Sequence, residues 1–119
     1  TFYSSKDLKS WMKESEFGAV AGAHGGVWEC PDFFQLSTPE GKKWVLIINI
    51  NPGAPNGGSG TQYFIGDFDG KNFTNLNAPE QALYVDYGKD VYAGIPYNGL
   101  PKEQATLVAW MSQPDSNER

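Results

Sequence analysis

The sequence contains little that could build a disulfide, a metal site or a membrane anchor. Its 119 residues include one cysteine, Cys30, and one histidine, His24. A lone cysteine cannot form an internal disulfide, and one cysteine with one histidine does not supply the ligands of a usual zinc site. The longest apolar run, residues 44–48, is far too short to cross a lipid bilayer. The sequence therefore supports neither a metal nor a membrane as a partner.

Basic residues are also scarce. Nine Lys and Arg residues stand against fourteen Asp and Glu residues, the formal net charge is -5, and the basic residues are scattered along the chain. Nucleic-acid binders concentrate positive charge on one face or stripe, so nucleic acid is not an expected partner. The length suits one domain, and a hydrophobic share of 39% is enough to build a packed core.

The apolar pattern predicts short strands and no long helix. The expected strands lie in residues 27–36, 44–50, 61–73, 83–88, 91–97 and 106–112, and the strand in 61–73 is expected to turn at Asp69-Gly70. Uninterrupted apolar residues at 44–50 predict a central strand that is buried on both faces. Residues 6–17 have some apolar residues at helical spacing, and we expect a loop or a single helical turn there. The pattern as a whole predicts an all-β fold, for which a sandwich, a barrel and a propeller blade all remain open.

Glu29 is the acidic residue that strand formation alone explains least well. It lies in VWECPDFFQL, residues 27–36, among bulky apolar neighbours. Burying a carboxylate is costly unless it is partnered. Apolar surroundings would also raise the pKa of this carboxyl group, as a general acid working near neutral pH requires. Glu29 is therefore the candidate general acid, whereas Asp67, Asp69 and Asp86 are better explained as solvated strand ends or turn residues.

Two glycine-rich segments have simpler explanations than catalysis. Residues 18–26 are small enough for the backbone to approach another part of the molecule closely. His24 in this segment could act as a base, but a structural or substrate-contacting role is more common for such a histidine, and no serine or cysteine is evidently paired with it. Residues 56–60 lack the lysine and serine of a phosphate-binding loop and precede a strand, so a flexible turn explains them.

Four motifs occur in an order that resembles glycoside hydrolase family 32, the fructan hydrolases that include levanases, exo-inulinases and invertases. The motifs are WECPDFFQL, SGTQYFIGDFDGKNF, VDYGKDVYA and AWM. The opening FYSSKDLKSWMKESEFG also resembles the segment before the family's Glu-Cys motif. The resemblance covers nearly the whole chain and implies antiparallel four-stranded blades that form a partial segment of a five-bladed β-propeller. Residues 1–119 would amount to about two blades of the catalytic domain.

The resemblance also implies roles for individual residues. Glu29, in the Glu-Cys motif, would be the general acid/base of a retaining mechanism. Trp28 and His24 would lie near the sugar cleft and contact substrate. Asp90 falls in a motif whose acidic residue lies near the entrance of the active site, which implies a binding role. Cys30 would either tune the surroundings of Glu29 or act as a small buried hydrophobic residue.

The implied function is part of a retaining fructan β-fructosidase of the levanase, inulinase or invertase type, which hydrolyses terminal fructosyl bonds without a metal or organic cofactor. Two motifs of the family do not occur in the sequence. These are the Trp-Met-Asn-Asp-Pro-Asn-Gly type motif, which carries the nucleophile, and the Arg-Asp-Pro motif, which binds sugar hydroxyls. We therefore expect an internal fragment that is inactive alone. The alternative is a non-catalytic fructan-binding remnant of a propeller that uses Trp28, Tyr92 and Asp90.

The expected partners follow from the same resemblance. They are a fructan or sucrose-type carbohydrate, and either the remainder of the propeller or further copies of the chain, because a cut propeller leaves unpaired strand edges. Family habit implies an extracellular or periplasmic protein. Tyr92 and Trp110 are expected in the core of a blade, and the role of Asn49 is left open.

Overall fold

The structure, a computed structural model, describes residues 1–88, 91–101 and 104–111. Within these residues the chain forms strands joined by turns, and no helix that could span a membrane is found among them. The strands are β1 (Phe2–Ser4), β2 (Met12–Ser15), β3 (Val27–Thr38), β4 (Gly41–Asn51), β5 (Gly60–Phe68), β6 (Phe73–Asn75), β7 (Leu83–Tyr84), β8 (Val91–Pro96) and β9 (Leu107–Met111). The all-β prediction is confirmed.

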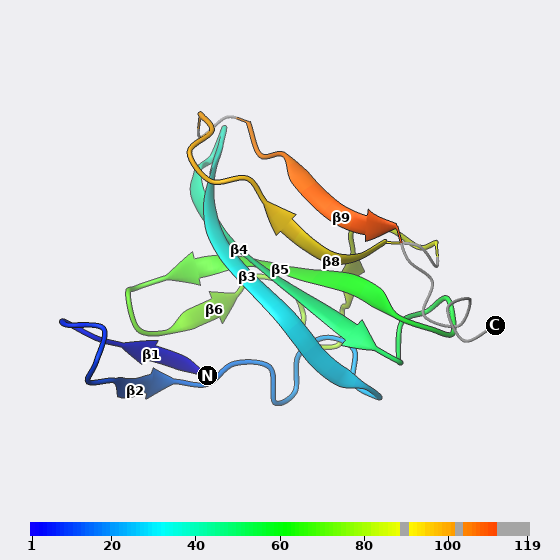
Figure 1. The fold of residues 1–119 in the computed structure, drawn as a ribbon, viewed down its shortest axis with the longest axis horizontal. Coiled ribbons are helices and arrows are strands. Elements are labelled where there is room, and N and C mark those ends of the chain that lie inside the picture. Colours follow the sequence, from blue (N-terminus) through cyan, green and yellow to red (C-terminus); the bar gives the residue numbers. More distant parts are fainter. Residues whose placement is uncertain (89–90, 102–103, 112–119) are drawn as a thin grey trace.

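The strands form three antiparallel sheets (Figure 1). The central sheet has the order β3-β4-β5-β6, and the short β7 also pairs with β5. The strands β1 and β2 form one hairpin, and β8 and β9 form another. Figure 1 shows these two hairpins on different sides of the central sheet, and β8 contacts β3, β4 and β5. Between residues 27 and 75 the chain therefore forms a meander of four antiparallel strands, β3 to β6.

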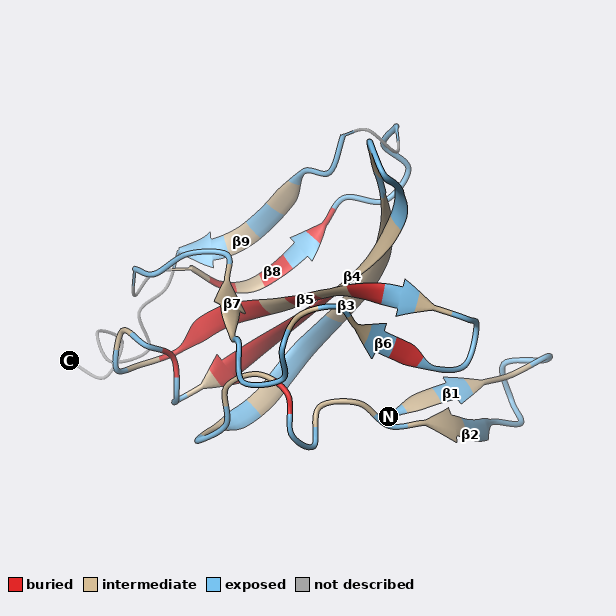
Figure 2. Cartoon of the chain, turned by 180° about the vertical axis from the view of Figure 1, so that it is seen from behind, coloured by how far each residue is buried: buried red, intermediate tan, exposed pale blue. Residues whose placement is uncertain are grey.

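The central strand β4 is covered on both faces, as its uninterrupted apolar sequence predicts. Its residues 46–50 are all buried (Figure 2). Leu46 and Ile48 project into a cluster of apolar side chains on one face. Residues at alternate positions project to the other face, where the Asn49 side chain accepts a hydrogen bond from the backbone of Ala93 in β8. One face is thus sealed by aromatic side chains and the other by β8.

The core on the first face is largely aromatic. Phe64 and Phe73 are buried there, and six partly buried aromatic side chains pack around the cluster: Phe2, Phe17, Trp28, Phe33, Trp44 and Phe68. Several pairs meet edge to face, such as Phe17 with Phe64 at 5.0 Å between ring centroids. Such pairs stabilise a fold by about 0.5–1.5 kcal/mol each beyond the area they bury. Phe2 in β1 fastens the β1–β2 hairpin to the central sheet.

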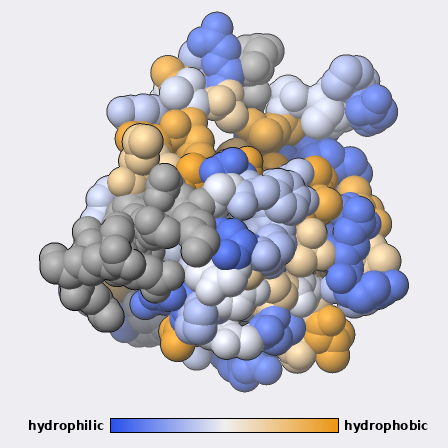
Figure 3. Space-filling model, turned by 90° about the vertical axis from the view of Figure 1, so that its right-hand side faces the viewer, coloured by the Kyte–Doolittle hydropathy of each residue, from blue (hydrophilic) through white to orange (hydrophobic). Residues whose placement is uncertain are grey.

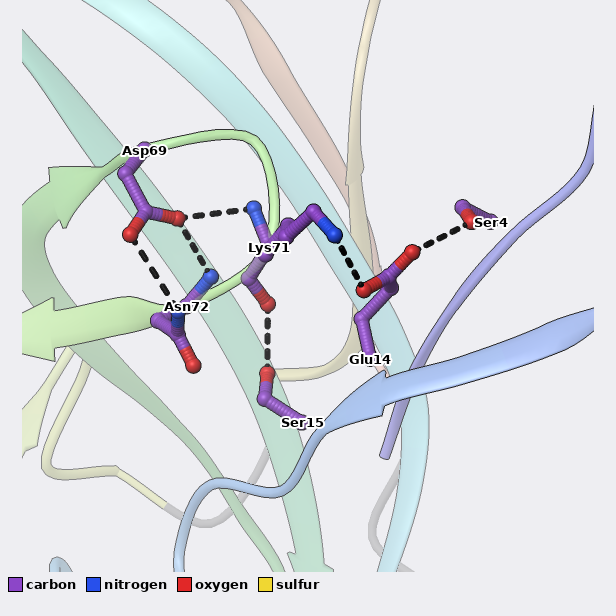
Figure 4. A network of polar contacts seen from close by, with 6 residues as sticks. All are labelled: Ser4, Glu14, Ser15, Asp69, Lys71 and Asn72. Atoms are coloured by element: carbon purple, nitrogen blue, oxygen red, sulfur yellow. Dashed lines mark hydrogen bonds and ion pairs between the residues drawn. The ribbon is translucent and has the colours of Figure 1, made fainter.

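A polar network joins the same hairpin to the turn between β5 and β6 (Figure 4). Glu14 accepts a hydrogen bond from Ser4 Oγ at 2.7 Å and pairs with Lys71 Nζ at 3.1 Å. Ser15 Oγ donates to the Lys71 carbonyl, and Asp69 accepts from the backbone N–H of Lys71. The hydrogen bond from Ser4 and then the interaction with Lys71 lower the pKa of Glu14. The carboxylate form that the network needs is therefore favoured.

Residues 12–15 form a strand, so the expected loop or helical turn over residues 6–17 is wrong in its second half. Residues 2–4 offer β2 an antiparallel partner, with Ser4 opposite Met12. This tertiary pairing outweighs the helical spacing of a few apolar residues. The turn between the two strands is held by Asp7, whose carboxylate accepts hydrogen bonds from the backbone N–H groups of Lys9 and Ser10.

Candidate active site

A β-bulge in β3 sets the position of Glu29. Glu29 pairs with Asn49 and Asp32 pairs with Ile47, so two residues of β3 lie opposite one residue of β4. The first of these two, Cys30, has a φ of 46°, in the left-handed region that non-glycine residues seldom adopt. Bulges of this kind redirect side chains and are common near functional sites.

The bulge separates the carboxylate from the aromatic core. Trp28 and Phe33 are five positions apart and would lie on opposite faces of a regular strand. The extra residue lets both rings pack in the core, while Glu29 lies in the row that faces β8. Glu29 is exposed. The expectation that it is buried among apolar neighbours is therefore wrong, because those neighbours project from the other face of the strand.

Tyr92 holds the carboxylate of Glu29 from β8. Its hydroxyl donates a hydrogen bond of 2.5 Å to Glu29 Oε2 across a separation of 63 residues. The tyrosine is only 8% exposed, so the prediction that it lies in a core is confirmed, but the role of its hydroxyl was missed. A tyrosine at a buried position usually has a hydrogen-bond partner, and this was the available signal in the sequence.

A hollow of about 370 Å³ lies beside Glu29, in the size range of small-molecule sites. Its lining residues are Thr1, Phe2, Phe17, Trp28, Glu29, Pro31, Phe33, Leu46 and Ile48. Glu29 is the only ionisable side chain among them. The hollow therefore has an apolar wall on the aromatic face of β3, and the Glu29 carboxylate lies at its border, where it is hydrogen-bonded to Tyr92 on the β8 side.

Trp28 and His24 lie together, but their contacts are mainly with the chain itself. Their rings stack with centroids 5.2 Å apart. The indole N–H of Trp28 donates to the carbonyl of Ala23 at 2.9 Å, and His24 Nε2 lies 3.1 Å from the carbonyl of Ala21. His24 is exposed and Trp28 is half-buried. A substrate-binding role for either residue remains a prediction.

Three other residues were expected to have a binding role or a buried place: Asp90, Cys30 and Trp110. Asp90 lies outside the described residues. Cys30 is exposed, which contradicts the interpretation of this residue as a buried hydrophobic side chain. Trp110 is 59% exposed, so its expected place in a blade core is wrong for this chain. Across residues 1–88, 91–101 and 104–111, no group of three or more His, Cys, Asp or Glu side chains is placed to hold a metal ion.

We expect the Tyr92–Glu29 contact to make stability sensitive to alkaline pH. Burial of the ring, and then the hydrogen bond to Glu29 and its charge, raise the pKa of Tyr92 above the ordinary value of 10.0. A group whose pKa is higher in the folded state than in the unfolded state stabilises the fold fully at pH values below its unfolded-state pKa. This stabilisation is lost as the pH rises through its folded-state pKa. The midpoint of urea unfolding should therefore fall more between pH 8 and pH 11 in the wild-type chain than in Tyr92→Phe.

The exposed Tyr97 provides the control for this measurement. Tyr97→Phe should follow the wild-type chain, because its ring is 58% exposed. An equal fall for Tyr92→Phe and the wild type would show that the Tyr92 hydroxyl makes no pH-dependent contribution.

Sequence comparison relates the whole chain to one family. Residues 1–119 match the glycosyl hydrolases family 32 N-terminal domain. The levanase of Bacillus subtilis (strain 168) is 49% identical over 115 residues, which cover 92% of this chain and 17% of the levanase. The extracellular exo-inulinase inuE of Aspergillus niger is 44% identical over 119 residues, covering 92% of this chain and 22% of that protein. The chain thus spans about a fifth of the length of these relatives.

Solved structures agree with the sequence comparison. The exo-inulinase from Aspergillus awamori superposes with a TM-score of 0.81 at 41% identity, over 93% of this chain and 23% of that protein. A β-fructofuranosidase from Schwanniomyces occidentalis, complexed with fructosyl-erythritol, has a TM-score of 0.81 at 37% identity, over 93% of this chain and 21% of that protein. These neighbours are five-bladed propellers, and the present sheets are a partial segment of that fold. The chain belongs to glycoside hydrolase family 32.

Proposed function

We propose that this chain supplies the general acid/base of a retaining β-fructosidase that cleaves terminal fructosyl bonds of fructans or sucrose-type substrates. The observation that carries the proposal is the placement of Glu29, which is exposed beside a hollow and oriented by the Tyr92 hydroxyl. The names of the relatives, levanase and exo-inulinase, support the substrate class. Trp28 and His24 are proposed to border the sugar site, and Asp90 its entrance.

Two proton transfers define the role of Glu29. In the first step its carboxyl group protonates the glycosidic oxygen while the bond to the fructosyl carbon breaks, and a second carboxylate forms a covalent bond with that carbon. In the second step the Glu29 carboxylate takes a proton from water, whose oxygen displaces the second carboxylate and releases fructose. Retaining glycosidases place the two carboxyl groups about 5 Å apart. The nucleophile motif does not occur in residues 1–119, so the proposal assigns the second carboxylate to another segment of the enzyme.

A chimeric levanase tests the proposal. The segment of the Bacillus subtilis levanase that matches this chain would be replaced by residues 1–119, and release of fructose from levan, inulin and sucrose would be measured. We expect the chimera to release fructose and the isolated chain to release none. A folded chimera without activity on any of the three would contradict the proposal.

The absence of the nucleophile motif favours a second candidate, a fructan-binding module without catalysis. This function would require the isolated chain to bind a fructo-oligosaccharide through the half-buried Trp28 and its neighbours. Calorimetric titration of the chain alone distinguishes the two: binding without hydrolysis in both the chain and the chimera would favour the module.

We further propose that β3–β6 form one complete blade and that the β1–β2 and β8–β9 hairpins belong to its two neighbours. The whole domain segment would then amount to about two blades. The names of the exo-inulinase relatives include the word extracellular, and we propose that the parent enzyme is secreted.

Exposed apolar side chains on the β8–β9 hairpin predict self-association of the isolated chain. Ile95, Val108 and Met111 are 52%, 51% and 85% exposed, and β9 pairs only with β8 among the described strands. Figure 3 shows hydrophobic residues that reach the surface in separate patches on one face of the molecule. An unpaired edge of this kind tends to pair with another chain.

The sedimentation coefficient should accordingly rise with protein concentration. Val108→Lys should reduce this rise, because a charge on an edge strand opposes pairing. A compact monomer over a wide concentration range would contradict self-association.

A further inference from the structure

Asn49 is a fully buried amide that connects the two strand irregularities beside Glu29. Its exposed fraction is 0%. Asn49 Nδ2 donates to the carbonyl of Cys30 at 3.2 Å. Its Oδ1 accepts from the backbone N–H of Ala93 at 2.9 Å and from Thr61 Oγ1 at 2.6 Å. One side chain therefore joins β3, β5 and β8.

The two backbone groups on β3 and β8 belong to similar bulges. Cys30 follows Glu29 and has a φ of 46°, while Ala93 follows Tyr92 and has a φ of 53°. The pairing register of β8 with β9 shifts directly after Tyr92, as that of β3 with β4 does after Glu29. Left-handed conformations are unfavourable for such residues and persist only where their surroundings hold them.

The chemistry of the contacts fits the amide at position 49. The Cys30 carbonyl can only accept a hydrogen bond, and the Ala93 N–H can only donate one. A single short side chain satisfies both only if it carries a donor and an acceptor, and asparagine carries them on two separate atoms, Nδ2 and Oδ1. An ionised aspartate has the same shape but no donor, and it would place its charge against the Cys30 carbonyl.

We propose that Asn49 is a positioning residue for the acid/base Glu29. Its side chain hydrogen-bonds to the bulge of β3 and to the bulge of β8 and so fixes their relative positions. The residues it holds, Cys30 and Ala93, each directly follow one partner of the Tyr92–Glu29 hydrogen bond. The amide thereby sets the separation between the Glu29 carboxylate and the Tyr92 hydroxyl. The inference rests on the proposed function of Glu29 and adds to it the residue that fixes its geometry.

The kinetic test compares Asn49→Asp with Thr61→Val in the chimeric levanase. Displacement of a catalytic group by about 1 Å can cost about 100-fold in rate, so Asn49→Asp should lower kcat by about that factor and leave KM within about twofold. Thr61 is 1% exposed, and Thr61→Val removes a hydroxyl that contacts both the Asn49 amide and the Val91 carbonyl, but it leaves both bulge contacts of Asn49 intact. It should retain kcat within a few-fold. Equal losses in the two variants would overturn the proposal, because they would indicate general damage to the core.

A double-mutant cycle with Tyr92→Phe separates positioning from stability. If Asn49 acts through the Tyr92–Glu29 contact, both substitutions disrupt the same contact. The loss of kcat in the double variant should then be much smaller than the product of the two single losses. Multiplicative losses would overturn the proposal.

A readout without catalysis comes from Cys30, the only cysteine in the chain and an exposed one. In the isolated chain, Asn49→Asp should change the rate at which a thiol reagent modifies Cys30 several-fold, whereas Thr61→Val should not. An unchanged rate in Asn49→Asp would show that the amide does not hold this bulge.

Glu29→Gln in the chimeric levanase distinguishes a failure of the Asn49 proposal from a failure of the proposed function. If that variant is inactive while Asn49→Asp turns over normally, only the present proposal fails, and if it remains active, the proposed function fails with it.

Discussion

Replacing Glu29 with glutamine in the chimeric levanase is expected to lower kcat by about 100- to 10,000-fold, the usual contribution of a general acid or base. Glutamine has nearly the same shape, and its carbonyl can still accept the hydrogen bond that the Tyr92 hydroxyl gives to Glu29. It cannot release a proton to the glycosidic oxygen or take one from water. The loss should therefore come from chemistry and not from a collapse of the bulge.

Initial rates of fructose release from levan over a range of pH would measure this effect. KM should change little, because glutamine keeps the size and shape of the glutamate side chain. The limb of the pH profile that reports the acid should disappear in the variant. Glu40→Gln supplies the matched control, since Glu40 is an exposed acid at the β3–β4 turn and should retain full activity. Full activity of Glu29→Gln would mean that another group protonates the leaving oxygen.

The stereochemistry of the product tests the pairing of Glu29 with a second carboxylate. A separation of about 5 Å predicts retention, whereas inversion requires a wider gap that admits a water molecule. The fructose first released by the chimera, followed by NMR before its anomers equilibrate, should therefore keep the configuration of the substrate.

Much of the fold could be predicted from local patterns. The apolar density of residues 44–50 identified the buried centre of β4, and the turn at Asp69-Gly70 identified the end of β5. The Glu-Cys motif identified Glu29 through resemblance to the family. These features depend on residues that are close together in the sequence.

The geometry around Glu29 could not be predicted in this way, because it depends on contacts between distant strands. Tyr92 lies 63 positions from Glu29, and Asn49 lies 44 positions from Ala93. The alternation of side chains in β3 suggested an acid among apolar neighbours. The bulge at Cys30 changes which side chains share a face, and its local signal in the sequence is Pro31, because proline inside a strand occurs at edges and bulges.

Gly26→Ala is expected to destabilise the chain by about 3 kcal/mol or more, at the upper end of the cost of overpacking. A Cβ atom at position 26 would lie 1.8 Å from the carbonyl oxygen of Pro52 and 2.6 Å from the carbonyl carbon of Asn51. Both are backbone atoms, so no side-chain rotation can relieve the clash. The next residue, Val27, begins the pairing of β3 with β4. The substitution should therefore push apart the strand ends that carry Trp28 and Glu29.

Gly88→Ala provides the matched control for this clash. It makes the same chemical change at an exposed position, where the added Cβ would meet the Asp86 carboxylate at 2.9 Å, at the end of a flexible side chain that can move away. Thermal unfolding followed by circular dichroism should show a fall in Tm of about 10 °C or more for Gly26→Ala and little change for Gly88→Ala. Similar Tm values for both variants would mean that residues 18–26 can move away from Pro52 at little cost. The close approach of the two backbones would then not be what fixes the start of β3, and the placement of Glu29 would have to depend on the bulge contacts alone.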